Sequence, residues 1–261
     1  VMWSGDYLQE LIDRIAFCIS DEDAVEAIAC LSLKPGAQNA IEACGLNGHQ
    51  FAMLRFTHDE LMAMLPPEGI LIQKKYLGEL KKWLGTDEVE LNISEKRLHF
   101  RTGDGKETFS LPLSYYQYPD YMNFLAKLSA DSVSRLELPR KDAMDALDRL
   151  LIFNTDSNRC TYFDLDGNGG AGEVMLSAQG QDVGSATETL EATYSGDIKK
   201  IAFPTRNLIE IMGHYRSERL GLTLTGSEGP CGLTGSDDSE YTVIIMPMKI
   251  VEETYYSEEE V

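Results

Sequence analysis

The first apolar pattern in the chain is helical. Over residues 6–17 the polar positions alternate with an apolar stripe whose members recur every three or four residues: Leu8, Leu11, Ile12 and Ile15. This spacing places the four side chains on one face of a helix. Ser4 stands just before the stripe, where its hydroxyl can cap the helix N-terminus. The pattern predicts a short amphipathic helix.

Short apolar runs follow this helix. They lie at residues 27–33, 40–46 and 51–56. Each run is too short and too apolar for another long helix, so the pattern predicts three strands. Turn signals separate them at Lys34-Pro35-Gly36 and at Asn47-Gly48.

A second strand and helix follow the turn at Pro66-Pro67-Glu68-Gly69. The expected strand covers residues 70–72, and the expected helix covers residues 74–84 and stops at Gly85. Alternating patterns then predict three more strands, at residues 89–93, 98–101 and 108–113.

The same order repeats in the second half of the chain. Residues 142–153 match residues 9–17, and residues 201–211 overlay residues 70–80, both at a displacement of about 130 residues. A repeat of this length is better interpreted as two homologous domains than as a solenoid. We expect an α+β fold in which each domain packs two helices on antiparallel β-sheets.

The domain boundaries follow from this repeat. We expect one domain over residues 1–128 and a second over residues 133–250, with a short polar linker near residues 127–134. Residues 251–261 carry a run of glutamates, and we expect them to form a disordered acidic tail.

The last strand pattern, residues 241–250, changes character at Pro247. The first half is β-branched and apolar, and proline then removes the backbone donor that a central strand needs. Met246 and Met248 flank the proline, and methionine adapts to varied apolar partners. Taken alone, the pattern favours an ordinary final core strand over a binding surface.

Composition argues for a soluble intracellular protein. No apolar run approaches the roughly 18 residues that a bilayer requires, and the N-terminus is not basic. The five cysteines form no Cys-x-x-Cys pair, so we expect buried free thiols. A net charge of −20 argues against a nucleic-acid partner.

Local charge departs from this trend in the helix expected at residues 74–84. Lys74, Lys75, Lys81 and Lys82 stand against the single acid Glu79. The corresponding helix of the second copy carries Arg206, His214 and Arg216 against Glu210. A solvated helix face and a surface that contacts a polyanion by charge alone are about equally supported.

The sequence offers no catalytic or metal-binding constellation. Asp164-Leu165-Asp166-Gly167-Asn168-Gly169 opens like a calcium loop, but position twelve is Met175 where a bidentate Glu is needed. We therefore interpret it as a hairpin turn. The four histidines show no ligand spacing, and no nucleophile elbow or phosphate-binding loop is found. We expect a protein that is not an enzyme and binds no metal or cofactor.

Several segments resemble the sliding clamp family, the β subunit of bacterial DNA polymerase III. They are Phe17-Cys18-Ile19-Ser20, Gly45-Leu46-Asn47-Gly48-His49-Gln50-Phe51-Ala52, Tyr118-Pro119-Asp120-Tyr121, Ala192-Thr193-Tyr194-Ser195-Gly196 and the ending at residues 241–250. These segments span nearly the whole chain and correspond to the second and third domains of the family.

The resemblance implies a function. Family members form a ring of six domains around duplex DNA as a processivity factor in the bacterial cytoplasm. The polymerase, the clamp loader and repair proteins dock short peptides between the second and third domains. The resemblance implies that this pocket comprises Ile28, Leu46, Gly48, His49, Phe51, Ile244, Met246, Pro247 and Met248, with Lys249 in place of an arginine. The cations that would face DNA are Lys74, Lys75, Lys81, Lys82, Arg206 and Arg216.

Departures from the family leave alternatives open. Leu46, Asn47 and Gln50 replace a threonine, an aspartate and an arginine, which implies a bulkier and more apolar pocket wall. Residues 23–26 lack a basic residue common after the first helix. The family's first domain has no counterpart here, so we expect either a fragment or a two-domain form that needs three copies for a ring. A clamp-fold interaction scaffold that does not encircle DNA is the alternative function.

Overall fold

A computed structural model of the chain describes residues 1–21, 26–156, 158–167, 172–180 and 183–250. The expected acidic tail at 251–261, most of the loop at 23–26 and the end of the calcium-like segment lie outside the described residues.

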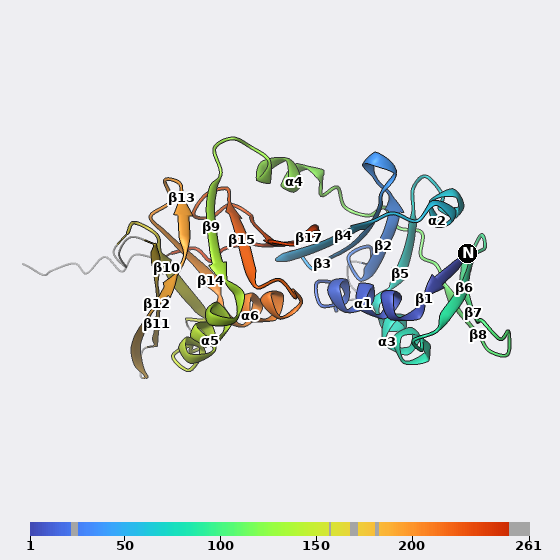
Figure 1. The fold of residues 1–261 in the computed structure, drawn as a ribbon, viewed down its shortest axis with the longest axis horizontal. Helices are drawn as coiled ribbons and strands as arrows, with labels where there is room; N and C mark the ends of the chain where they lie inside the picture. The colour runs from blue at the N-terminus through green and yellow to red at the C-terminus, as the bar shows by residue number, and fades with distance from the viewer. Residues whose placement is uncertain (22–25, 157, 168–171, 181–182, 251–261) are drawn as a thin grey trace, which may run out of the picture.

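One antiparallel sheet of nine strands runs through both halves of the chain (Figure 1). Five strands come from the second half and four from the first. In spatial order they are β13 (Thr193–Ser195), β9 (Ser134–Pro139), β15 (Arg219–Leu224), β16 (Cys231–Gly235), β17 (Asp238–Ile245), β4 (Gln50–Phe56), β3 (Ile41–Leu46), β2 (Cys30–Pro35) and β5 (Ile70–Gln73). We call the pairing of β17 with β4 the seam, because it joins the two halves.

Two four-stranded sheets complete the β structure, one in each half. The first has the order β1 (Met2–Ser4), β6 (Glu88–Ile93), β7 (Arg97–Thr102) and β8 (Thr108–Pro112). The second has the order β12 (Gly184–Glu191), β11 (Glu173–Gly180), β10 (Cys160–Asp164) and β14 (Lys200–Pro204).

The long helices lie together on one side of the molecule (Figure 1). They are α1 (Gly5–Ala16), α3 (Lys74–Trp83), α5 (Arg140–Leu151) and α6 (Thr205–Gly213). The first two pack against each other in the first half, and the last two pack in the second half. This arrangement of helices on antiparallel sheets confirms the expected α+β fold.

The sequence explains where α1 begins and how it packs. Ser4 is the N-cap, and its Oγ accepts a hydrogen bond from the Tyr7 N–H at 3.3 Å. The predicted apolar stripe is buried, so it packs the helix onto the core. None of the described helices is long and apolar enough to cross a membrane.

Two short helices were not predicted, α2 (Asp59–Met64) and α4 (Met122–Leu128). Each helix is shorter than two full turns, which is too short to show a periodic apolar stripe. The N-terminus of α2 is capped by a histidine, because His58 Nδ1 accepts from the Leu61 N–H at 3.4 Å. In α4, Met122 and Phe124 are apolar but exposed. The sequence pattern therefore does not single out the two leucines that pack inward.

Two boundaries differ from the expectation. The strand expected at residues 27–33 begins at Cys30 and continues through Pro35, so the Lys34-Pro35 step belongs to β2 and the turn follows it. The linker expected near residues 127–134 is shorter, because α4 extends to Leu128 and β9 begins at Ser134. A one-turn 3₁₀ helix, η1 (Ala37–Asn39), lies between β2 and β3.

The two halves end in the same way, as the repeat predicts. Beyond Pro112 the Ser114 N–H donates to the Leu71 carbonyl at 2.9 Å, and beyond Pro247 the Met248 N–H donates to the Ala202 carbonyl at 2.7 Å. In each half the chain thus leaves its last strand at a proline and returns to the strand that precedes the second long helix. The ending with a strand and then a proline is therefore a feature of the fold.

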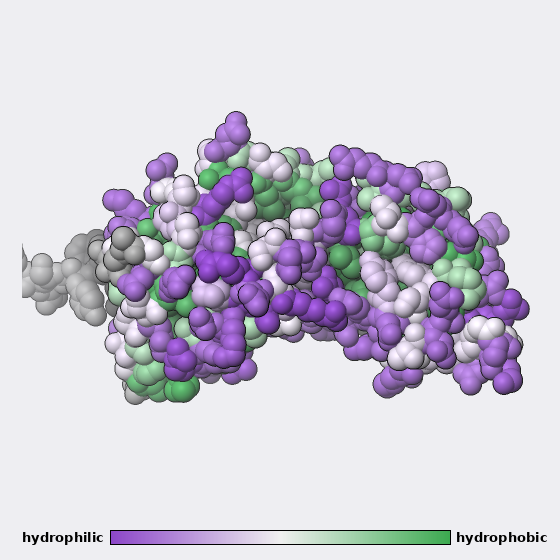
Figure 2. All heavy atoms as spheres, viewed as in Figure 1, coloured by the Kyte–Doolittle hydropathy of each residue, from purple (hydrophilic) through white to green (hydrophobic). Residues whose placement is uncertain are grey.

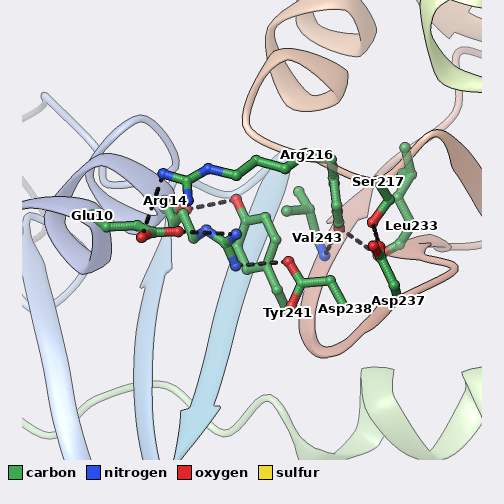
Figure 3. Close-up of polar contacts among 10 residues, drawn as sticks. Glu10, Arg14, Arg216, Ser217, Leu233, Asp237, Asp238, Tyr241 and Val243 are labelled. Carbon is green, nitrogen blue, oxygen red and sulfur yellow. Dashed lines mark hydrogen bonds and ion pairs between the residues drawn. The ribbon is translucent and has the colours of Figure 1, made fainter. Parts of the chain in front are cut away.

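A polar cluster ties α1 to the second half beside the seam (Figure 3). The Arg14 guanidinium pairs with Asp238 at 2.7 Å and lies over the Tyr241 ring at 4.9 Å. The Tyr241 hydroxyl donates to the Arg14 carbonyl at 2.7 Å. Glu10 contacts both Arg14 and, at 3.4 Å, Arg216. The cluster is mostly buried around Arg14, so its contacts are poorly screened by solvent.

An aromatic stack adds to this contact. The rings of Phe17 and His214 are parallel within 9°, with centroids 4.0 Å apart. Burial lowers the pKa of His214, the nearby Arg14 lowers it further, and Asp13 partly opposes the change. The imidazole is thereby favoured in its neutral form, which suits a ring stacked on an apolar partner.

We expect Arg14→Ala to lower the free energy of unfolding by about 1–3 kcal/mol, because it leaves Asp238 without its partner and removes the cation from the Tyr241 ring. Lys82→Ala is the control, since Lys82 and Glu79 are both largely exposed, and it should cost less than about 1 kcal/mol. Urea unfolding of both variants measures the difference. Equal losses would show that the cluster does not help hold the halves together.

Candidate functional site

The seam brings three predicted pocket residues into one row across the sheet. Leu46 on β3 is in register with Phe51 on β4, and Phe51 is in register with Ile244 on β17. Side chains alternate along a strand, so these three lie on the same face of the sheet. Their neighbours Ala52 and Val243 belong to the core beneath the helices, so the row lies on the opposite face, which we call the outer face.

The turn between β3 and β4 forms one rim of this row. The Asn47 Oδ1 accepts from the His49 and Gln50 N–H groups at 3.0 and 2.9 Å, and Gly48 has a φ of 88°. Gly48 and His49 are therefore held in an exposed tight turn. The Met246 N–H donates to the His49 carbonyl at 3.1 Å and fastens the turn to the end of β17.

Ile28 is joined to the same rim through Ser20. The Ser20 N–H is shared between the Ile28 carbonyl at 3.1 Å and the Leu46 carbonyl at 3.2 Å. This forked hydrogen bond places the two predicted pocket residues beside each other, although Ile28 precedes β2.

The remaining predicted pocket residues follow the end of β17. Met246 and Pro247 are half-buried, whereas Met248 is 41% exposed and Lys249 is exposed. The backbone of Met248 is bound to β14, the edge strand of another sheet. The structure thus assembles the row and the rim, while Met248 and Lys249 continue past them.

Gln50 does not share the outer face with Phe51. Because Gln50 and Phe51 are adjacent on β4, their side chains point to opposite faces. The replacement of an arginine by Gln50 therefore does not place a different side chain on the outer wall of the row. Leu46 is a member of the row, so the replacement of a threonine by Leu46 does make the wall of the row bulkier and more apolar.

A second layer covers the row, and sequence reasoning assigned it no role. The covering residues come from the segment around α4. They are Tyr118, Tyr121, Leu125 and Leu128. The Phe51 and Tyr121 rings are 4.8 Å apart, and Phe51 and Ile244 are only 6% and 4% exposed. The signal that could have revealed this layer is the pair of tyrosines in Tyr118-Pro119-Asp120-Tyr121, next to a strand end.

Tyr121 is anchored to the sheet by a buried carboxylate. Its hydroxyl donates to Glu42 at 2.6 Å, and the Lys34 Nζ lies 4.4 Å from the centre of its ring. Glu42 also pairs with Arg55 at 3.3 Å. Burial raises the pKa of Tyr121, and the Cys44 thiol and the Glu42 carboxylate raise it further. The hydroxyl therefore remains a donor.

A hollow of about 520 Å³ lies beneath α4. Glu42, Met53 and Arg55 line it from the first half, and Arg135 and Thr242 line it from the second. Gly232 permits the close approach of the helix, because a Cβ there would lie 2.7 Å from the Leu128 side chain. The whole outer face at the seam is therefore built jointly by the two halves.

The predicted cations lie on the helix side, and most have acidic partners. Lys81 pairs with Asp13, Lys82 with Glu79 at 2.8 Å, and Arg216 with Glu10. Lys74 is tied down further, since its Nζ pairs with Asp21 at 2.7 Å and donates to the Ile19 carbonyl at 2.8 Å.

Lys75 and Arg206 are exposed cations on α3 and α6. Among the described residues neither has an ion pair within 4.0 Å, and the Lys75 Nζ lies 5.2 Å from the centre of the Tyr76 ring. These two are the cations most available to an external anion.

The described residues contain no group of three or more metal-ligating side chains. All five cysteines are free and buried, as expected from the sequence. Burial raises the pKa of Cys44 to about 12, so this thiol stays protonated at neutral pH.

The chain is similar in sequence to known sliding clamps. Residues 130–249 match the family model for the DNA polymerase III beta subunit, C-terminal domain. The beta sliding clamp of Pseudomonas putida is 26% identical over 93% of this chain and 64% of its own length. The clamp of Chlamydia muridarum is 23% identical over 94% of this chain and 64% of its own length. The chain thus spans about 64% of the length of these relatives.

Solved structures show the same fold. The C. crescentus beta sliding clamp superposes with a TM-score of 0.85 at 20% identity, covering 96% of this chain and 65% of its own. The Bartonella birtlesii clamp bound to griselimycin has a TM-score of 0.82 at 23% identity, covering 96% and 66%. Sliding clamps are non-catalytic, which agrees with the prediction that the chain is not an enzyme.

Residues 130–249 therefore match the C-terminal domain of the DNA polymerase III beta subunit, and the chain is similar over nearly its whole length to bacterial beta sliding clamps.

Proposed function

We propose that the chain acts as the second and third domains of a sliding clamp, a processivity factor that encircles duplex DNA in the bacterial cytoplasm. Replicative polymerase, clamp loader and repair proteins would dock short linear peptides on the outer face at the seam. The observation that supports this most is the apolar row of Leu46, Phe51 and Ile244, which exists only because the two halves share one sheet.

The ends of the sheets support assembly into a ring. By the internal repeat β8 corresponds to β17, and β12 corresponds to β4. In the described chain β8 and β12 are the end strands of their sheets. The pairing that forms the seam can therefore be repeated at each end with another clamp domain. A chain of domains joined in this way closes into a ring when the successive rotations add up to a full turn.

The helix side suits loose contact with DNA. Helix α3 carries four lysines against one glutamate, although the protein as a whole is strongly acidic. A ring holds DNA by enclosing it, so the lining needs only weak phosphate contacts that permit sliding. The carboxylate partners of Lys81 and Lys82 keep that attraction weak.

The ion pairs of these lysines also support a second candidate function, a clamp-fold interaction scaffold that does not encircle DNA. In that case the lysines serve the fold through their own carboxylates, and only the outer face binds partners. The two functions share the peptide site and differ in topological retention of DNA.

Retention on circular DNA separates the two. After loading onto a nicked plasmid by the clamp loader of a related bacterium, the protein should co-elute with the circle and be lost when the plasmid is linearised. Lys75→Glu with Arg206→Glu should lower the retained fraction severalfold, because both cations are exposed and neither has an ion pair among the described residues. Lys106→Glu is the control, since Lys106 lies in a hairpin paired with Asp104. No co-elution of the wild type would favour the scaffold.

Griselimycin, the ligand of the Bartonella birtlesii structure, tests the peptide site by calorimetry. We expect Met246→Ala to weaken binding by about 1–3 kcal/mol, because it truncates a half-buried apolar side chain whose backbone is bound to the rim of the row. Ile152→Ala truncates an exposed apolar residue at the end of α5 and should change nothing. Binding by the wild type that Met246→Ala leaves unaltered would contradict the site assignment.

A further inference from the structure

We propose that Tyr118 is a built-in occupant of the apolar pocket, displaced when a peptide inserts an apolar anchor. This inference rests on the proposed peptide-docking function and concerns how the site opens. It assigns to one side chain the space that an incoming leucine or phenylalanine would take.

The first observation is that the row is covered by the chain itself. Phe51 and Ile244 are almost fully buried, and the segment between β8 and α4 supplies the cover. A peptide can reach these side chains only if part of that cover moves. At least one of the covering side chains must therefore leave its place when a peptide binds.

Tyr121 is held too firmly for that role. Its hydroxyl is bound to Glu42, its ring packs on Phe51, and the Lys34 Nζ lies over that ring, 4.4 Å from its centre. Moving it would leave the buried Glu42 carboxylate with Arg55 as its one side-chain partner among the described residues. Buried carboxylates that lose a hydrogen bond are strongly destabilising, so Tyr121 stays in place.

Tyr118 differs from Tyr121 in its polar contacts. Its hydroxyl is shielded from solvent and has no hydrogen-bond partner among the described residues. Burial raises the pKa of Tyr118, and the thiols of Cys44, Cys30 and Cys18 raise it further. A buried hydroxyl without a partner offsets much of what the ring gains by burial. Its release to water recovers that cost.

The backbone around Tyr118 can permit this release. Residues 115–120 form neither helix nor strand, and Tyr115, Tyr116, Gln117, Pro119 and Asp120 are all exposed. Tyr118 is the one member of this stretch that turns inward, and its ring meets Tyr121 edge-on with centroids 6.4 Å apart. A rotation of this side chain does not require any strand to break.

The occupant that replaces Tyr118 should be apolar. A phenylalanine or leucine side chain fills the same volume and leaves no donor unpaired, whereas tyrosine repeats the existing defect. A peptide must compete with Tyr118 for the pocket. Its apparent affinity is therefore reduced in proportion to the fraction of molecules in which the pocket is open.

Two substitutions at one position test this with opposite signs. Tyr118→Ala removes the occupant and should tighten griselimycin binding about tenfold, as expected if about nine-tenths of the molecules are closed. Tyr118→Phe keeps the ring and removes the unpaired hydroxyl, so it should hold the pocket closed and weaken binding severalfold. Tyr115→Ala, in the same stretch and 69% exposed, is the matched control and should change nothing.

A second measurement follows the side chain directly. In protein labelled with 3-fluorotyrosine, the fluorine signal assigned through Tyr118→Phe should move toward that of exposed tyrosine when griselimycin is added. The inference is overturned if the Tyr118 signal does not move on addition of griselimycin, or if both substitutions weaken binding. In either case Tyr118 is a fixed part of the pocket wall. This readout decides the matter even if Tyr118→Ala fails to fold. Absence of griselimycin binding in every form, Tyr118→Ala included, would instead overturn the proposed function.

Discussion

The structure depends on the backbone pairing of β4 with β17. Five residue pairs, from Tyr241 with Leu54 to Ile245 with Gln50, convert two sheets into one sheet of nine strands. The register is decisive, because a slip of β17 by one residue along β4 would turn Ile244 toward the helices and bring Val243 to the outer face. The contacts of Arg14 with Asp238 and Tyr241 hold the same junction from the helix side.

This one sheet separates two kinds of surface. On one side, Lys75 and Arg206 are exposed on helices whose other cations are largely paired with carboxylates. On the other side, α4 lies over the outer face (Figure 1). Apolar side chains from both halves meet there. Viewed from the direction of Figure 2, charged and polar residues dominate most of the surface, and apolar residues gather near the upper middle. Weak contact with a polyanion and tight contact with a peptide can therefore coexist without competing for residues.

Local patterns were enough to predict much of the fold. The long helices have complete apolar stripes, Ser4 caps α1, and the repeat of about 130 residues revealed the doubled architecture. The same patterns could not reveal α2 or α4, because a helix of six or seven residues has too few positions for a stripe. They also ended β2 too early, since Pro35 lies at the end of a strand and not in the turn.

The site was predicted only in part, for a different reason. Leu46, Phe51 and Ile244 were named from the resemblance, and the register places them side by side. The cover of Tyr118 and Tyr121 depends on contacts between segments far apart in the sequence, such as the hydrogen bond from Tyr121 to Glu42, 79 residues away. No local pattern specifies such a contact. Glu42, a glutamate within an apolar strand, is a second signal of this layer beside the pair of tyrosines.

Hydrogen–deuterium exchange with and without griselimycin tests the central claim most directly, that the outer face at the seam is where a peptide docks. The account predicts that ligand slows or otherwise alters exchange at residues 46–51, 115–125 and 244–248, while β11 and the β12 edge are unchanged. A ligand effect confined to β12 or to the helix side, with no change at those three segments, would contradict it.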